Sequence, residues 1–473
     1  MPINKCAKEV SMPENFIEKR IQEKTASCEI EFSERMAQSL KPETYIDPSL
    51  YTKYDVKRGL RNSNGTGVAV GLSRTGSSEG YVMEEGVKKP IPGKLYYRGY
   101  DVEDIVAAAD RENRFGYEET SFLLLFGHLP SKSELEEYTA MLSSRRRLPL
   151  GFTHDMILAV PSPNIMIKLA RSVLALYSYD SNADDISIAN VLRQSIDLIA
   201  RFPAIAAYGY EAKHSYYCDE SLHIHQPVPE FSTAENILHM IRPDGKFTPL
   251  EAKMLDLSMI LHADHGGGNN SAFTTHVVSS TGTDTYSAIA SAICSLKGPK
   301  HGGANVEVLG MIKDLKANVS DITDYGEVEE YLKKLLNKEA FDRSGLIYGL
   351  GHAVYTISDP RATVLKKMAR TLAEEKGLLN EFLLYDFIER RGPQLLNEHR
   401  GTDKPVCANV DLYSGFVFNA LNIPEDMAAP LFAASRISGW CAHRIEELVS
   451  GKIIRPAYLN AQECREYIPM ENR

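Results

Sequence analysis

The feature of this sequence that most constrains its fold is an apolar spacing of three and four residues, which recurs in segment after segment beyond Asp101. This is the period of an amphipathic helix, because side chains at those spacings share one helical face. No repeat of fixed period appears, and no alternation of strand and helix patterns supports a parallel sheet. The sequence therefore predicts a large, mainly α-helical protein. One expected helix opens at Val102, another spans 120–126, and Ser131 with Glu134 forms the capping box of a third. The other expected helices cover residues 162–178, 185–200, 233–241, 249–262, 284–296, 304–316, 326–337, 361–376, 378–397, 412–422, 426–439 and 439–449.

The first hundred residues have a different character. Residues 1–45 are polar with weak helical periodicity, and we expect an N-terminal extension there. Glycines are then frequent up to Gly99, with the short β-like pieces VAV at 68–70, YVM at 81–83 and KLYY at 94–97 between them. Glycine-punctuated strands of this kind predict small hairpins in the N-terminal third.

Composition excludes several classes of protein. The 473 residues are 43% hydrophobic and 25% charged, which is typical of a globular chain with large cores. A net charge of −10 argues against a nucleic-acid binder, which would normally carry a basic face. No apolar run reaches the roughly 18 residues of a membrane span. We therefore expect neither nucleic acid nor a membrane as a partner.

The cysteines and the N-terminal segment favour the cytoplasm. The seven cysteines are scattered, odd in number and without a CxxC pair, so we expect reduced thiols rather than a disulfide framework. The first twenty residues lack the apolar stretch of a signal peptide and contain Glu9, Glu14 and Glu18, unlike a transit peptide.

Four polar islands interrupt the helical pattern and contain most of the candidate catalytic residues. They are LHADHGGGNNS (261–271), KGPKHGGAN (297–305), YGLGHAVYTISDPR (348–361) and ANVDLYSG (408–415). Three of them place histidine beside glycine, and the fourth places a carboxylate at an expected helix start. We interpret them as loops that meet at one site.

His301 and His352 both occupy glycine-rich breaks. A histidine at the positive N-terminal end of a helix is pushed toward the neutral imidazole, which can donate an N–H to an oxygen that becomes an enolate. The alternative for His301 is a buried histidine that satisfies a helix end, and for His352 a glycine-rich connection between helices. The fragment GLGHAV is only a partial dinucleotide fingerprint, since it lacks the third glycine and a preceding strand.

Asp411 precedes an apolar helical pattern, so it can be an N-cap or a general base whose carboxylate the helix start keeps ionised. His262 and His265 form an HxxH pair without the glutamate and spacing of HExxH or a third ligand nearby, so we expect no metal. Arginine forks beside the islands would suit a small dicarboxylate or tricarboxylate. These arginines are Arg361, Arg436 and Arg455.

The islands resemble the citrate synthase family through motifs that follow the family order and span most of the chain. The motifs are YRGYD at 97–101, LLLFGHLPSKSEL at 123–135, LHADHGGGN at 261–269, GPKHGGAN at 298–305, GHAVYTISDPR at 351–361 and NVDLYSG at 409–415, followed by the segments of Arg436 and Arg455.

The resemblance implies an almost wholly helical fold and a homodimer with a shared active site. It implies a large helical domain from residues 46–302 and 421–473, and a smaller helical domain, 303–420, that closes over the substrates. The implied reaction condenses acetyl-CoA, a co-substrate, with oxaloacetate and hydrolyses citryl-CoA, with no permanently bound cofactor.

The resemblance also implies the role of each site residue. His301, His352 and Asp411 would be the catalytic trio, while His265, Arg361 and Arg436 would bind oxaloacetate or the product's carboxylates. Arg455 looks like the arginine that the family contributes across the dimer interface. The backbone around Gly345, Gly349 and Gly351 is the expected contact for CoA.

Three alternatives remain beside this interpretation. A 2-methylcitrate synthase would use propionyl-CoA with the same catalytic groups, because one methyl in a pocket changes binding by only about 1–3 kcal/mol. A zinc hydrolase would need metal at His262 and His265, and a noncatalytic helical scaffold would leave the trio without a shared cleft. The chain also departs from many family members by having Gly266 where they have glutamate, which leaves the support of His265 open.

Overall fold

The computed structural model describes residues 32–62, 64–85 and 87–473. The chain divides into two compact units, one made of Met1–Leu72 with Arg455–Arg473 and the other of Ser73–Ile454. Residues 1–31 of the expected N-terminal extension lie outside the described part, and residues 32–44 form a helix.

The first unit has short elements and little buried apolar surface. It contains α2 (Pro48–Lys53) and the 3-10 turns η1 (Arg58–Leu60) and η5 (Met470–Asn472). The Asp47 carboxylate caps α2 by accepting the N–H of Ser49 at 2.8 Å. VAV at 68–70 forms no strand, so that expectation is wrong. A strand needs a paired neighbour and a buried face, and Val70 is largely exposed.

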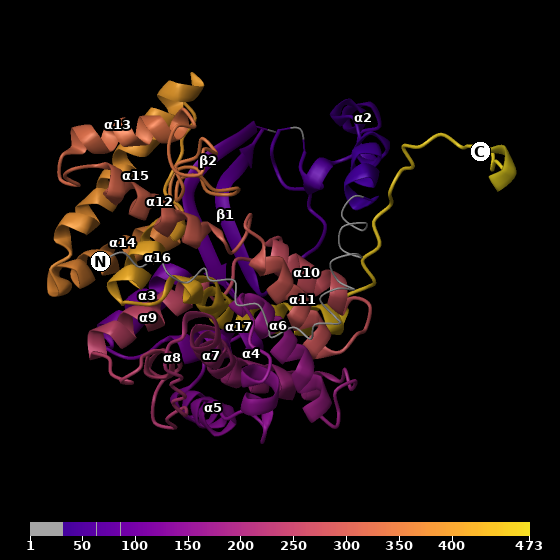
Figure 1. Ribbon diagram of the computed structural model, residues 1–473. Coiled ribbons are helices and arrows are strands. Elements are labelled where there is room, and N and C mark those ends of the chain that lie inside the picture. The colour runs from indigo at the N-terminus through magenta and orange to yellow at the C-terminus, as the bar shows by residue number, and fades with distance from the viewer. Residues whose placement is uncertain (1–31, 63, 86) are drawn as a thin grey trace, which may run out of the picture. The chain divides into compact units, whose positions relative to one another are not determined.

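The second unit begins with a small antiparallel sheet of strands β1 (Gly76–Glu84), β2 (Val87–Tyr97) and β3 (Tyr100–Asp101), in that order. Gly76 lies opposite Tyr97, and the register shifts between Glu79 and Tyr81. This confirms the expected hairpins at YVM and KLYY. Figure 1 shows β1 and β2 side by side among the helices of the unit.

Helices make up most of the second unit, as predicted. They are α3 (Val102–Arg111), α4 (Tyr117–Phe126), α5 (Lys132–Arg145), α6 (Ile165–Leu176), α7 (Ile188–Cys218), α8 (Thr233–Ile241), α9 (Pro249–His262), α10 (Asn270–Ser279), α11 (Thr285–Lys297), α12 (Ala304–Asn318), α13 (Tyr325–Leu336), α14 (Pro360–Lys376), α15 (Leu379–Arg400), α16 (Val410–Ala420) and α17 (Ala428–Ser450), with the short helical turns η2 (Thr153–Leu158), η3 (Tyr177–Tyr179) and η4 (Glu425–Met427).

Three helices differ from the expected ranges. α7 continues through Pro203. The middle of this helix is buried on nearly all sides, and the packing outweighs the roughly 3 kcal/mol that an internal proline costs. α10 was not predicted, because its buried positions are mostly small or polar and give no apolar period. The two segments expected at 426–439 and 439–449 form one helix, α17, that runs through Gly439.

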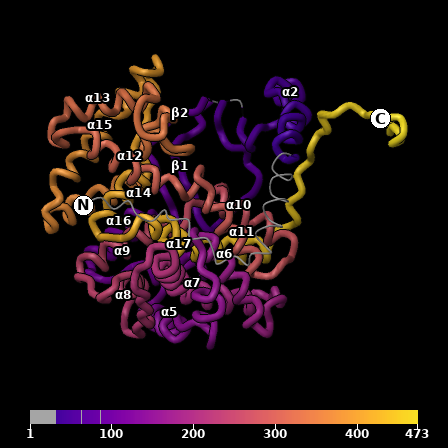
Figure 2. The backbone as a smooth tube through the Cα atoms, viewed as in Figure 1, coloured from indigo at the N-terminus to yellow at the C-terminus, as the bar shows by residue number. Residues whose placement is uncertain are grey.

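α17 is the central element of the second unit. It packs on α7, α10, α11, α4 and α9, and its buried side chains include Trp440 and the charged Arg436 and Arg444. The tube in Figure 2 shows α17 between the group α12–α16 and the helices α5, α7 and α8. Within the group α12–α16, each helix packs on others of the same group.

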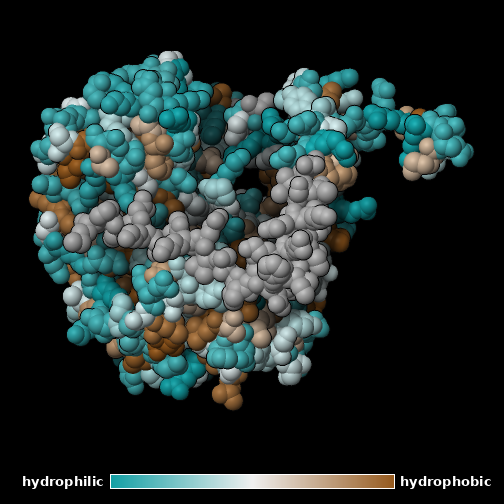
Figure 3. Space-filling model, in the orientation of Figure 1, coloured by the Kyte–Doolittle hydropathy of each residue, from teal (hydrophilic) through white to brown (hydrophobic). Residues whose placement is uncertain are grey.

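The exposed side chains of this unit are ordinary for an amphipathic helical protein. On the face drawn in Figure 3, the surface over α13 and α15 is mostly hydrophilic. Within the described ranges, no helix is both long and apolar enough to cross a membrane.

The cysteines depart in part from the expectation of reduced thiols. Cys294, Cys407, Cys441 and Cys464 are free, whereas Cys218 is disulfide-bonded. Spacing along the chain does not reveal such a bond, because pairing depends on the distance between the folded backbones.

Candidate active site

Each polar island lies where one helix ends or another begins, and the first three are mainly loops, as predicted. The fourth is mostly helical, because residues 410–415 form the start of α16. The first island connects α9 to α10, and the second connects α11 to α12. The third ends at α14, where the Asp359 carboxylate caps the helix by accepting the N–H of Arg361 at 3.0 Å. The fourth ends at α16, which Asn409 caps through the N–H of Asp411.

His265 and Arg436 have buried side-chain nitrogens without a protein partner. Arg436 is fully buried, and its Nε donates to the His262 carbonyl at 2.7 Å. Among the described residues, neither its Nη1 and Nη2 nor His265 Nε2 has a hydrogen-bond partner. Buried unpaired donors are costly, and a cationic fork is the natural partner of a carboxylate. This pair is therefore suited to an anionic ligand.

Arg361 is arranged differently, because its guanidinium is already paired. Its Nε donates to Asp359 Oδ1 at 3.0 Å, and its Nη2 donates to Asp359 Oδ2 at 2.7 Å. Both side chains are almost fully buried. The bidentate pair fixes the plane of the guanidinium, and Nη2 also lies 3.5 Å from His352 Nε2.

The hydrogen bonds of His352 indicate where its proton lies. Nδ1 accepts the backbone N–H of Val354 at 3.1 Å and of Tyr355 at 3.2 Å. The neutral ring therefore carries its proton on Nε2. Two donors, His352 Nε2 and Arg361 Nη2, then point toward the same region, where they can share an acceptor oxygen.

The glycine-rich loop is paired with the segment that leads into α16. The Gly351 N–H donates to the Cys407 carbonyl at 2.8 Å, and the Asn409 N–H donates to the Gly349 carbonyl at 2.9 Å. Gly349 and Gly351 have φ of 86° and 89°, a backbone region that favours glycine. This pairing joins the loop of His352 to the helix start that holds Asp411.

Asp411 has the electrostatics of a base. Burial raises the pKa of its carboxyl group to about 6, against the opposing effect of the Arg361 guanidinium. It therefore remains ionised at neutral pH while being more basic than an ordinary aspartate.

His301 lies at the turn before α12 and is held from one side. Its Nε2 lies 3.1 Å from Asn269 Oδ1 and 3.1 Å from Ser271 Oγ. Trp440 Nε1 donates to the same Ser271 oxygen at 3.0 Å. The Ser271 hydroxyl donates to Asn269 Oδ1 at 2.9 Å, and this amide oxygen only accepts, so His301 Nε2 is the donor to it in this arrangement.

His265 feels the charges of four other predicted site residues. Burial, and then the charge of Arg361, holds the pKa of His265 well below its usual range. The other groups whose charges act on it are His352, Arg436 and His301. Burial followed by the charge of Arg436 lowers the pKa of His301 to about 4. Both rings are therefore neutral at pH 7.

The backbone conformation and the close packing at position 266 explain why glycine follows His265. Gly266 has φ of 80°, and a Cβ there would lie 3.1 Å from the Gly76 carbonyl oxygen. Its N–H donates to Asp264 Oδ2 at 2.9 Å, so a buried carboxylate holds the loop.

His265 itself packs edge-on against His352 and Tyr355. Gly76 also lines a surface hollow of about 520 Å³ that includes Arg74 and Arg98.

Some predicted residues lie elsewhere. His262 is buried against Phe418 and Phe432, donates Nδ1–H to the Ser258 carbonyl, and belongs to no metal-ligating group within the described residues. Arg455 is exposed and belongs to the first unit. Gly345 has φ of 82° and lies beside Lys338.

Sequence reasoning assigned no role to Asn269, Ser271, Asp359 or Trp440, although three of the four stand in the quoted islands. Their contribution is to orient other side chains. The islands marked the region, but the partner of each histidine or arginine could not be identified from spacing.

Comparison with known families gives a consistent result. The family model described as "Citrate synthase, C-terminal domain" matches residues 66–457. A protein named citrate synthase from Haloferax volcanii is 34% identical over 388 residues, covering 80% of this chain and 93% of that protein. A 2-methylcitrate synthase from Shewanella oneidensis is 32% identical, covering 80% of this chain and 92% of that protein.

A solved structure agrees over a similar share of the chain. It is the citrate synthase from Thermoplasma acidophilum, described as a ternary complex with carboxymethyl coenzyme A and oxaloacetate. It superposes with a TM-score of 0.71 at 26% identity and covers 88% of this chain and 98% of that one.

Proposed function

This chain belongs to the citrate synthase family, and we propose that it condenses acetyl-CoA with oxaloacetate and hydrolyses the resulting citryl-CoA to citrate and CoA. It is an acyltransferase whose acyl group becomes an alkyl group on transfer. The observation that carries this assignment is the set of buried nitrogens without a protein partner, His265 Nε2 with Arg436 Nη1 and Nη2, together with a buried aspartate, Asp411, whose pKa is raised to about 6.

Oxaloacetate supplies what these donors lack. One of its carboxylates would accept from the two η nitrogens of Arg436, and His265 Nε2 would donate to the same molecule if it carries the ring proton. The ketone oxygen would accept from His352 Nε2, with Arg361 beside it. As the new carbon–carbon bond forms, the charge that develops on this oxygen is stabilised by the same donors, and His352 gives up its proton to the alkoxide.

Acetyl-CoA would be activated by Asp411 and His301. A thioester methyl is a very weak acid, so the enolate oxygen must be stabilised while the proton leaves. Asp411 removes the methyl proton, and the His301 Nδ1–H donates to the thioester oxygen. This requires the His301 proton on Nδ1, so the Ser271 hydroxyl would turn from Asn269 Oδ1 to donate to His301 Nε2, 3.1 Å away. Water then hydrolyses citryl-CoA.

The glycine loop is the proposed contact for CoA. A Cβ at Gly351 would meet no atom within 4 Å, so a ligand can approach the backbone there. Gly349 instead packs against Leu412, and Gly345 lies beside the cationic Lys338. We assign Gly351 to direct approach and the other two glycines to the shape of the loop.

A small domain at residues 303–420 is part of the proposal, with 46–302 and 421–473 as the large domain. The mutual packing of α12–α16 supports it. Closure of this group over the large domain would exclude water before condensation and strengthen each polar contact in the site.

A homodimer with a shared site completes the proposal, with Arg455 contributed to the partner's site. The first unit exposes many large apolar side chains, which include Leu40, Tyr45, Tyr458, Leu459 and Tyr467. Exposed apolar surface of this kind is typical of an interaction region. A cytoplasmic location stays a prediction, supported by the four free thiols and opposed by bonded Cys218.

The test is release of free CoA thiol by the purified protein with oxaloacetate and either acetyl-CoA or propionyl-CoA. Faster, oxaloacetate-dependent release from acetyl-CoA is the expected result. Preference for propionyl-CoA would instead identify a 2-methylcitrate synthase, and no release from either thioester would refute catalysis.

A further inference from the structure

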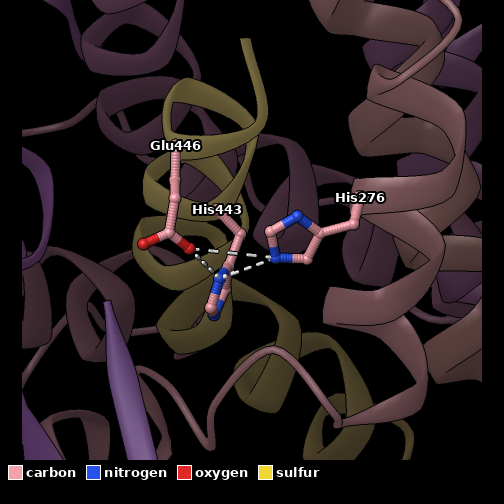
Figure 4. A group of neighbouring side chains, drawn as sticks. All are labelled: His276, His443 and Glu446. Atoms are coloured by element: carbon pink, nitrogen blue, oxygen red, sulfur yellow. Dashed lines mark hydrogen bonds and ion pairs between the residues drawn. The ribbon is translucent and has the colours of Figure 1, made fainter. Parts of the chain in front are cut away.

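A second cluster of titratable side chains lies outside the proposed substrate site, between α10 and α17. Figure 4 shows the His276 imidazole pointing from α10 toward His443 and Glu446 on α17. His443 and Glu446 are three residues apart and so share a helical face. His443 is fully buried, and the side chains of His276 and Glu446 are mostly buried. Within the described residues, this is the one group of three whose atoms are close enough to share a metal ion.

Three specific atoms converge in this cluster. His276 Nε2 lies 3.1 Å from His443 Nδ1, and Glu446 Oε2 lies 3.5 Å from His443 Nδ1 and 4.0 Å from His276 Nε2. The three distances define a triangle with a central point about 2.1 Å from every corner, which matches the usual lengths of zinc–nitrogen and zinc–carboxylate bonds.

The outer nitrogen of each ring is held by a carboxylate. His443 Nε2 lies 3.1 Å from Asp264 Oδ1, and His276 Nδ1 lies 2.8 Å from Glu447 Oε2. Ionised carboxylate oxygens only accept hydrogen bonds, so both outer nitrogens are donors. Against the effect of burial, the carboxylates of Asp264 and Glu446 raise the pKa of His443 to about 9, so at neutral pH its Nδ1 carries a proton toward His276 Nε2. A metal ion would displace this proton, and both inner nitrogens would then be ligands. Such a carboxylate–histidine arrangement is the usual support of a metal ligand.

The charges around the cluster favour a cation, which is either the His443 imidazolium or a metal ion in its place. Asp264, Glu446 and Glu447 contribute three carboxylates around two imidazoles, and two lone pairs 3.1 Å apart repel unless a proton or a metal ion lies between them. A single proton between the rings satisfies the nitrogen pair, and Glu446 Oε2 then accepts from the Ser73 hydroxyl at 2.8 Å. A divalent ion satisfies all three inner atoms.

The surroundings leave room for a further ligand. A Cβ at Gly267 would lie only 3.2 Å from His276 Nε2, so glycine keeps a side chain away from the ligand atoms. Ser73 Oγ donates to Glu446 Oε2 at 2.8 Å, and the Arg74 N–H donates to Glu446 Oε1 at 2.5 Å. Ser73 and Arg74 line the hollow of about 520 Å³, which places Glu446 next to an opening in the surface.

We propose that His276, His443 and Glu446 bind one divalent transition-metal ion, with Zn²⁺ the best match to this donor set. The site is distinct from His262 and His265. It does not depend on the proposed condensation, because its ligands include none of the residues assigned to substrate. Through Asp264, which precedes His265, the ion would tie the substrate loop to α10 and α17.

The test uses the full chain, stripped with a chelator and then titrated with Zn²⁺ by calorimetry, with bound metal counted after dialysis. We expect one ion per chain in the wild type and at least a tenfold loss of affinity in H276Q and E446Q. H128Q is the matched control, because His128 is an exposed histidine that also faces a glutamate, Glu134, at 3.4 Å. It should bind as the wild type does.

A second measurement keeps the proposal testable if a variant folds poorly. Zn²⁺ should raise the melting temperature of the wild type and of H128Q, and Co²⁺ should give the visible spectrum of a coordinated ion in both. A wild type that retains no Zn²⁺ and shows no shift would overturn the proposal and leave a proton-linked histidine pair. Binding that H276Q and E446Q retain in full would overturn it equally.

Discussion

Two regions of the site differ in whether their polar side chains have hydrogen-bond partners within the protein. Around α17 and the first island, the donors of His265 and Arg436 are buried without partners. Around the third and fourth islands, Arg361 is paired with Asp359, and His352 Nδ1 accepts two backbone N–H groups. The difference indicates that the first region binds the substrate, because its buried nitrogens have no partner until a ligand is present. The second is already oriented for chemistry, since its groups are fixed before a ligand arrives.

The largest effect on activity should come from removing the base, Asp411. D411N keeps the shape of the side chain but cannot accept the methyl proton, so kcat should fall about 10³-fold. Steady-state release of CoA thiol measures this loss. A D411N enzyme with kcat within tenfold of the wild type would exclude Asp411 as the base.

Breaking the ion pair of the oriented region should mainly cost stability. D359N leaves the Arg361 guanidinium buried without its carboxylate, which should lower the free energy of unfolding by about 3–5 kcal/mol. Denaturant unfolding, followed by the fluorescence of the single tryptophan, Trp440, measures it. The account of a pre-oriented region fails if D359N is as stable as the wild type.

In the binding region, a substitution should reduce substrate affinity rather than stability. Arg444, on the same helix as Arg436, provides a matched control. R436M should weaken oxaloacetate binding about 100-fold while changing the unfolding free energy little, since two of the three guanidinium nitrogens have no protein partner. Arg444 on the same helix donates to Thr285 Oγ1, Ser279 Oγ and the Thr283 carbonyl. R444M should therefore lose more than about 2 kcal/mol of stability and keep its oxaloacetate affinity. Similar effects of both variants would contradict the distinction.

The smallest expected effect is the dependence of kcat on pH. The reaction needs ionised Asp411, whose pKa is about 6, so the rate should be level above that value and fall about tenfold per pH unit below it. His301 stays neutral over this range, because its pKa is about 4. The measurement is kcat between about pH 5 and about pH 8, with Trp440 fluorescence as the control for folding. A rate that does not change across about pH 6 would argue against the assignment.

Much of the fold could be predicted, because the helical period depends on local apolar spacing. The exceptions have tertiary causes. Gly439 looks like a break in the sequence, yet a Cβ there would lie 2.5 Å from the Ala263 carbonyl oxygen, so glycine allows α17 to approach the loop of His265. α10 is held by buried small and polar side chains such as Ser271 and Thr275, which no hydrophobic period reports.

The site could be predicted as a set of residue types but not as a set of pairs. Histidine beside glycine marked the islands that contain His265, His301 and His352. The partners come from elsewhere in the chain, as Trp440 does when it donates to Ser271, and the separation of 169 positions gives no local signal. The cluster of His276 with His443 was missed for the same reason.

The most direct test of the division between binding and chemistry is a calorimetric titration of oxaloacetate into the wild type, D411N and R436M in parallel. The account predicts that D411N binds oxaloacetate within a few-fold of the wild type, whereas R436M loses about two orders of magnitude in affinity. Loss of binding in D411N with affinity retained in R436M would contradict it.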